Sequence, residues 1–126
     1  MRRLALLAAL GLLIAFPSSA GAGPYPNPGS HACAKVVLGG LHRIFPRAAG
    51  IVCGRARTIS AYWYRARRCW DFGAAAPARN TCHLGAWRCE ARPDPADVGN
   101  LEIQSLWARC KRGGATVTIA TFPEQD

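Results

Sequence analysis

The sequence "CGRARTISAYWYRARRCW", from Cys53 to Trp70, holds five arginines and three aromatic residues between two cysteines near its ends. Its apolar residues recur at helical spacing, at Ala56, Ile59, Trp63 and Ala66. This spacing predicts an amphipathic helix with one buried stripe, and the arginines, which fall largely elsewhere, would form a charged outer face. The helix should end near Trp70, because the Asp-Phe-Gly sequence that follows is a stop signal.

A second informative stretch lies near the C-terminus. Residues Ala115 to Phe122, "ATVTIATF", are rich in β-branched side chains and predict a strand. Gly113-Gly114 precedes this strand and is typical of a two-residue hairpin turn, so Leu106 to Arg112 would be the partner strand. The alternative is a helix that begins after Asn100, covers residues 101–110 and ends at Gly113. We favour the hairpin because it pairs the strong strand with its nearest neighbour in the chain.

The Gly-Gly turn also predicts which residues of the hairpin face one another. The opposed pairs would be Arg112 with Ala115, Cys110 with Val117, and Ala108 with Ile119. The apolar members of these pairs would share the core face, while Trp107 and Arg109 would point the other way. Trp107 is therefore the best candidate for an exposed aromatic contact, whereas we expect Trp63 and Trp87 inside the core.

Three shorter segments also predict strands. They are "CAKVVL" (Cys33–Leu38), "GIVCG" (Gly50–Gly54) and "HLGAWRCEA" (His83–Ala91). The segment between the first two is ambiguous, because Pro46 forbids a long helix through it. Together these elements predict an α+β fold: a small disulfide-stapled domain in which one amphipathic helix packs on a short antiparallel sheet.

The N-terminus is typical of an exported protein. A basic start and an apolar run from Leu4 to Phe16 precede the small residues Ala20 and Ala22. We expect a signal peptide over residues 1–22, a Pro/Gly-rich arm over residues 23–32 and a single disulfide-rich domain over residues 33–126. A membrane anchor is the alternative, but the apolar run is shorter than the roughly 20 residues that a spanning helix needs. After signal cleavage we expect no transmembrane segment.

All the cysteines follow the predicted signal peptide, at Cys33, Cys53, Cys69, Cys82, Cys89 and Cys110. An even number of cysteines in a small exported chain predicts a disulfide framework, although sequence alone leaves the pairing open. We pair Cys69 with Cys82, because a bond there closes a short loop that has little else to order it. A zinc site is the alternative, but the usual C-x-x-C and H-x-x-x-H spacings are absent. We expect no metal and no cofactor.

The chain is basic, with 16 Lys and Arg against 7 Asp and Glu and a formal net charge of +9. A surplus of this size attracts anionic partners. Arginine is abundant along the whole chain, as expected of a GC-rich coding sequence, and so does not indicate a specific nucleic acid. The candidate binding residues lie on the outer faces of the predicted helix and hairpin: Arg55, Arg57, Arg65, Arg68, Trp107 and Arg109. A diffuse basic face predicts comparable contributions from the four helix arginines.

Catalysis at neutral pH would need a histidine, and the chain has His31, His42 and His83. A histidine base needs a carboxylate or a second histidine within reach. Asp94 and Asp97 are candidates, but they lie in "PDPAD", where aspartate more often stabilises turns. We therefore expect no catalytic residues and predict that the histidines lie at the surface or pack in loops.

Three motifs resemble a loose class of small secreted cysteine-containing proteins from high-GC bacteria, especially actinobacteria. They are "IVCGRARTISAY", "LGAWRC" and "ARCKRGGATVTI", within Gly50 to Phe122. Proteins of this class show a Cys-x-x-Ala helix start, matched by Cys53 and Ala56, and a Gly-x-x-Cys strand, which is one residue longer here between Gly85 and Cys89. The resemblance implies an exported β-α-β-β domain with disulfides and carries over no catalytic residue.

These observations favour a non-enzymatic exported domain that acts by binding, at the cell envelope or outside it. Its partner would be an anionic envelope component or another protein. One alternative is a small cationic hydrolase, either a nuclease or a cell-wall hydrolase, that uses a histidine base. Another is a membrane-active antimicrobial protein.

Overall fold

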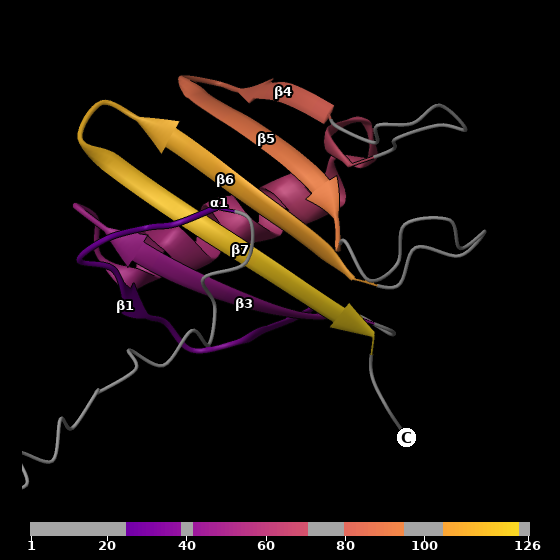
Figure 1. The fold of residues 1–126 in the computed structure, drawn as a ribbon, viewed down its shortest axis with the longest axis horizontal. Helices are drawn as coiled ribbons and strands as arrows, with labels where there is room; N and C mark the ends of the chain where they lie inside the picture. Colours follow the sequence, from indigo (N-terminus) through magenta and orange to yellow (C-terminus); the bar gives the residue numbers. More distant parts are fainter. Residues whose placement is uncertain (1–24, 39–41, 71–79, 95–104, 124–126) are drawn as a thin grey trace, which may run out of the picture.

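A computed structural model describes residues 25–38, 42–70, 80–94 and 105–123. Within them one helix packs on a single antiparallel sheet, so the α+β prediction is confirmed (Figure 1). The strands are β1 (His31–Ala32), β2 (Val36–Leu38), β3 (His42–Ala49), β4 (Asn80–Leu84), β5 (Trp87–Pro93), β6 (Leu106–Arg112) and β7 (Ala115–Pro123). Their order across the sheet is β1-β3-β7-β6-β5-β4, and β2 also pairs with β3.

The C-terminal hairpin has the predicted strands and the predicted register. Strands β6 and β7 pair around a turn at Gly113-Gly114, with Cys110 opposite Val117 and Ala108 opposite Ile119. All four of these side chains are buried. The alternative helix over residues 101–110 is wrong from residue 106 onward, and residues 101–104 lie outside the described part of the chain.

Helix α1 (Cys53–Arg65) carries the predicted buried stripe, with Ala56, Ile59 and Trp63 facing the core. It ends five residues earlier than predicted, at Arg65 instead of Trp70. Ala66 leaves helical geometry, with ψ at 83°, and the chain continues in the short 3₁₀ helix η1 (Arg67–Cys69). This change of direction brings Cys69 to its disulfide partner in β4.

Two predicted strands have other structures. The segment Gly50–Gly54 is not a strand, because Gly50 adopts a positive φ of 70° and Cys53 is already the first residue of α1. The segment His83–Ala91 is not one strand but parts of two, β4 and β5, with a turn at Gly85-Ala86 between them. Gly85 has a φ of 58°, a left-handed conformation that favours glycine and lets the chain reverse there.

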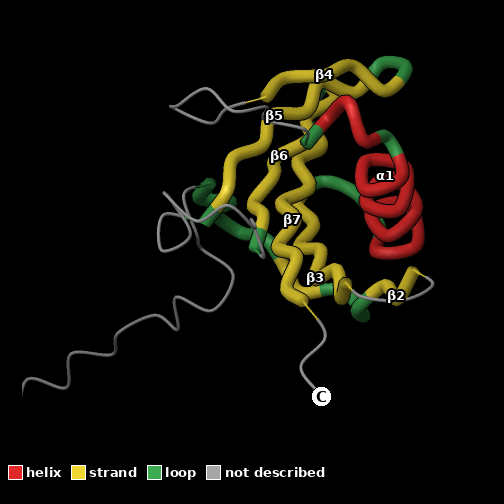
Figure 2. Tube along the Cα trace, turned by 90° about the vertical axis from the view of Figure 1, so that its right-hand side faces the viewer, coloured by secondary structure: helices red, strands yellow, loops and turns green. Residues whose placement is uncertain are grey.

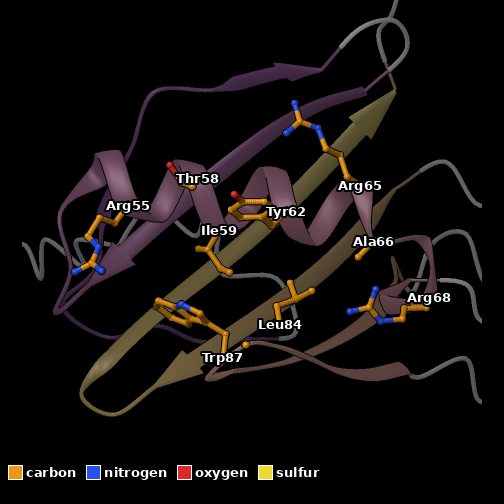
Figure 3. Close-up of a pocket in the computed structure, with 10 residues that line it drawn as sticks. Arg55, Thr58, Ile59, Tyr62, Arg65, Ala66, Arg68, Leu84 and Trp87 are labelled. Carbon is orange, nitrogen blue, oxygen red and sulfur yellow. The ribbon is translucent and has the colours of Figure 1, made fainter.

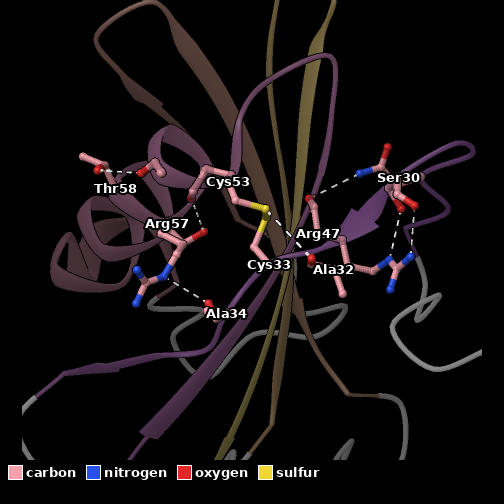
Figure 4. Close-up of a disulfide and its surroundings, with 12 residues drawn as sticks. Ser30, Ala32, Cys33, Ala34, Arg47, Cys53, Arg57 and Thr58 are labelled. Carbon is pink, nitrogen blue, oxygen red and sulfur yellow. Dashed lines mark hydrogen bonds between the residues drawn. A yellow bond between two sulfur atoms is a disulfide. The ribbon is translucent and has the colours of Figure 1, made fainter.

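Three disulfides join the cysteines, and the predicted pair Cys69–Cys82 is confirmed. The others are Cys33–Cys53, which ties the segment before β2 to the start of α1, and Cys89–Cys110, which crosses between β5 and β6. Figure 4 shows the first of these bonds. His31 lies near it, and the ligand atoms of these three residues fall within 4.8 Å of one another. The sulfur atoms of Cys33 and Cys53 are bonded to each other, so these two members of the cluster belong to the disulfide framework.

The two faces of the sheet have different coverings. Figure 2 shows α1 on one side of the sheet, where Ile44, Val117 and Ile119 pack with Trp63. The helix contacts β2, β3 and β7, whereas η1 contacts β4 and β5. On the opposite face Tyr25 of the N-terminal arm is buried against Arg92 and Arg109, with ring-to-guanidinium distances of 4.7 and 5.2 Å. No helix among the described residues is long and apolar enough to cross a membrane.

Candidate ligand-binding groove

A groove of about 650 Å³ lies between α1 and the β4–β5 hairpin. It exists because α1 packs over the β3 and β7 half of the sheet, whereas the β4 and β5 half is contacted only by the short helix η1. The chain crosses from one half to the other through η1, which joins the two walls (Figure 3). Ten residues line the groove: Arg55, Thr58, Ile59, Tyr62, Arg65, Ala66, Arg68, Leu84, Gly85 and Trp87.

The helical wall is one continuous face of α1. Its lining residues recur at the helical spacing that places side chains on one face, at Arg55, Thr58, Ile59, Tyr62 and Arg65. Ile59 is buried, because it also belongs to the core stripe, whereas 59% of Tyr62 is exposed. This wall therefore presents an apolar centre with an arginine toward each end.

The second wall is apolar and comes from the β4–β5 turn. Leu84 and Trp87 flank the Gly85-Ala86 turn and are partly buried against the core. They form a pair in the β4–β5 register, and Figure 3 shows both side chains below the helix, across from Ile59 and Tyr62. The prediction that Trp87 lies inside the core is therefore only partly met, because Trp87 also forms one side of the groove.

The third side is closed by η1. The Cys69–Cys82 disulfide binds η1 to β4. The Asn80 side chain donates to the backbone oxygen of Arg68 at 2.7 Å, and the Arg68 guanidinium donates to the backbone oxygen of His83 at 3.3 Å. These bonds hold Arg68 at this end of the groove, whereas Figure 3 shows the Arg65 side chain leaving the same end of α1 in a direction away from Leu84 and Trp87.

The charged side chains that line the groove are all positive, since three of the ten lining residues are arginines and none is acidic. Arg55 and Arg65 have no ion-pair partner among the described residues. A cleft lined by one sign of charge, with low-dielectric walls, concentrates its potential and attracts ions of the opposite sign.

Arg57 does not belong to the groove. Its guanidinium donates to the backbone oxygens of Ala34 and Lys35, at 3.1 and 3.2 Å. Figure 4 shows the contact with Ala34 beside the Cys33–Cys53 disulfide. Arg57 thus ties α1 to the segment before β2, and the expected equality of the four helix arginines does not follow from their positions.

Trp107 and Arg109 lie on the opposite face of the sheet, so they cannot share a site with the groove. Arg109 forms an ion pair with Glu90. The Trp107 indole nitrogen donates to an Asp94 carboxylate oxygen at 3.2 Å, and its ring meets Phe122 edge-on, with 5.8 Å between centroids. Trp107 is half-buried instead of standing exposed as a contact.

The histidines are dispersed. His31 and His83 are exposed and come from opposite edges of the sheet, in β1 and β4. The side chain of His42 and all of Asp97 lie outside the described residues.

Close to the end of the groove, partial burial raises the pKa of the Tyr64 phenol above its ordinary value, and the Tyr64 ring stacks on Trp70 with 5.7 Å between centroids.

The chain matches no protein-family model, no curated protein and no solved structure. The resemblance to small secreted bacterial proteins therefore stays a prediction.

Proposed function

We propose that this protein is an exported binding domain whose ligand is a small amphipathic anion held in the α1–hairpin groove. The observation that carries the proposal is the composition of the groove. An apolar centre of Ile59, Leu84 and Trp87 lies between arginines, and no lining residue is acidic. Its volume, about 650 Å³, is typical of small-molecule sites.

The arginines and the apolar walls of the groove would bind two different parts of one ligand. Guanidinium groups bind carboxylate, sulfate or phosphate through charge-assisted hydrogen bonds. Apolar walls stabilise a hydrocarbon or aromatic body at roughly 25 cal/mol per Å² removed from water. Arg55 and Arg65 are ten residues apart on one helix, or about 15 Å along its axis, so an acidic group can be met at either end of the groove.

The N-terminal sequence and the disulfides support the part of the proposal that concerns export. The apolar N-terminal run favours a signal peptide, and three disulfides are typical of proteins that fold in an oxidising compartment. The groove supplies arginines, which stay protonated at any physiological pH and therefore bind and orient anions without exchanging protons.

Calorimetric titration of the intact oxidised protein tests the proposal with alkyl probes below their micellar concentrations. Decyl phosphate should bind. Decyltrimethylammonium has the same chain and the opposite charge, and butyl phosphate has the charge without the chain, so both should bind at least tenfold more weakly. Equal binding of the three probes would contradict the proposal.

Matched variants connect the binding to the groove. Arg55→Gln/Arg65→Gln should weaken decyl phosphate by about tenfold or more, which corresponds to about 1.4 kcal/mol. Arg112→Gln serves as the control, because Arg112 is exposed and lies outside the groove lining. Wild-type affinity in the double variant would show that the ligand binds elsewhere.

Two other functions make different predictions. A hydrolase would turn over RNA, peptidoglycan or phospholipid and would lose turnover in a single His→Ala variant, such as His31→Ala or His83→Ala. A membrane-active protein would release dye from anionic vesicles. Either result would replace the binding proposal.

A further inference from the structure

The face of the sheet opposite α1 carries a pair of neighbouring cations. The strand register places Arg88 of β5 directly opposite Lys111 of β6. His83 of β4 continues this row on one side and Thr116 of β7 on the other. Directly opposed residues of antiparallel strands have Cβ atoms about 4.5–5.5 Å apart, so the two cations are held close together.

Such a pair is unfavourable by itself, because like charges directly opposite one another destabilise a sheet. Neither Arg88 nor Lys111 has an ion-pair partner among the described residues. The carboxylate nearest in the register is that of Glu90, in the adjacent row, and it is paired with Arg109. Glu90 and Arg109 offset each other, so the cluster of four side chains keeps a formal charge of +2.

These four residues surround a hollow of about 270 Å³. We infer that this hollow binds a tetrahedral oxyanion, either a phosphate or a sulfate group. One doubly charged group placed between Arg88 and Lys111 would offset both cations. The guanidinium and the ammonium would each donate charge-assisted hydrogen bonds to its oxygens.

This anion site is separate from the groove of the proposed function. Arg88 follows Trp87 directly in β5, and successive residues of a strand point to opposite faces of the sheet. Trp87 lines the groove beneath α1, whereas Arg88 lies on the far face with Lys111. The two sites can therefore be altered independently.

The like-charge pair gives the inference a distinctive signature in thermal unfolding. Without a bound anion, Arg88→Gln/Lys111→Gln should raise the Tm at low salt by about 1 to 5 °C, because it removes a repulsion. The same variant should lose the stabilisation that a bound oxyanion supplies, since binding to the native state raises the Tm.

The experiment measures the Tm of the intact oxidised protein in inorganic phosphate, in sulfate and in chloride, at matched ionic strength and at low millimolar concentrations where the general stabilising effect of phosphate and sulfate is negligible. Wild type should be stabilised more by phosphate or sulfate than by chloride, and the stronger of the two shows which group the hollow prefers. The additional increase in Tm that phosphate or sulfate gives over chloride should vanish in Arg88→Gln/Lys111→Gln. It should persist in the groove variant Arg55→Gln/Arg65→Gln. An equal effect of chloride, or an excess retained in the first variant, would overturn the inference.

Discussion

The backbone of Gly50 lies against the carbonyl group of Gly114, so closely that a Cβ atom added to Gly50 would come within 2.4 Å of that oxygen. Gly50 follows β3 directly and Gly114 belongs to the turn between β6 and β7. This contact therefore joins the bend that leads into α1 to the tip of the C-terminal hairpin.

Gly50→Ala should destabilise the protein strongly. The new methyl group would collide with backbone, and the φ of 70° is strained for any residue with a Cβ atom. We expect a loss of about 2 kcal/mol or more in the free energy of unfolding, measured by denaturant titration. Gly54→Ala is the control, because a Cβ atom there meets nothing within 4 Å. A helical alanine at that position should be neutral or stabilising. Equal losses in both variants would contradict the role of the Gly50–Gly114 contact.

Removal of the Cys69–Cys82 disulfide should affect both stability and ligand binding. Its sequence separation of 13 corresponds to about 3 kcal/mol in the chain-entropy account. Because this bond holds η1 against β4, Cys69→Ser/Cys82→Ser should also weaken decyl phosphate. Cys33→Ser/Cys53→Ser is the matched control, with a separation of 20 and a comparable stability cost. At a temperature where both variants are folded, the control should keep its affinity for decyl phosphate. Equal affinities in the two variants would show that the disulfide does not shape the groove.

Arg57→Ala should separate structural from ligand-binding arginines. Loss of its two hydrogen bonds to backbone oxygens should lower the free energy of unfolding by about 1 kcal/mol. Affinity for decyl phosphate should remain that of wild type. A loss of affinity as large as that of Arg55→Gln/Arg65→Gln would mean that the helix acts through a diffuse basic face.

Tyr64 predicts a loss of stability at alkaline pH. Burial raises the pKa of its phenol in the folded protein, so the neutral form is favoured by folding. Below the ordinary pKa of about 10, both states keep the proton and stability is complete. As the pH rises further, the unfolded state ionises first, and stability falls until the pH passes the raised pKa. Chemical denaturation between pH 9 and pH 11 should show a smaller decline in Tyr64→Phe than in wild type. An identical decline would assign the effect to other groups.

The parts of the fold that could be predicted were those determined by local pattern. The helical spacing of the apolar residues correctly predicted the buried face of α1, and the Gly-Gly turn correctly predicted the register of β6 and β7. Both signals act over only a few residues. The end of α1 was predicted too late, since the chain turns at Ala66 to reach a disulfide partner in a distant strand. Glycine conformation explains the other errors, because only the fold decides that Gly50 and Gly85 adopt positive φ.

The candidate site was predicted only in part. Arg55, Arg65 and Arg68 were singled out by charge, and the structure places all three at the groove. The groove face of the helix could have been recognised from the spacing of Thr58, Ile59 and Tyr62. The opposite wall could not, because Leu84 and Trp87 meet the helix only through the sheet order and the Gly85 turn.

An amide-resolved NMR titration of the oxidised protein with decyl phosphate locates the bound ligand without any mutation. A ligand held in the groove should cause the largest shifts in two segments that are far apart in sequence and lie on either side of the groove: residues 55–68 of α1 and η1, and residues 84–87 of the β4–β5 turn. The guanidinium signals of the lining residues Arg55 and Arg65 should also move, while that of Arg57 should not. Shifts spread over all exposed arginines, or confined to the face of the sheet opposite α1, would contradict binding in the groove.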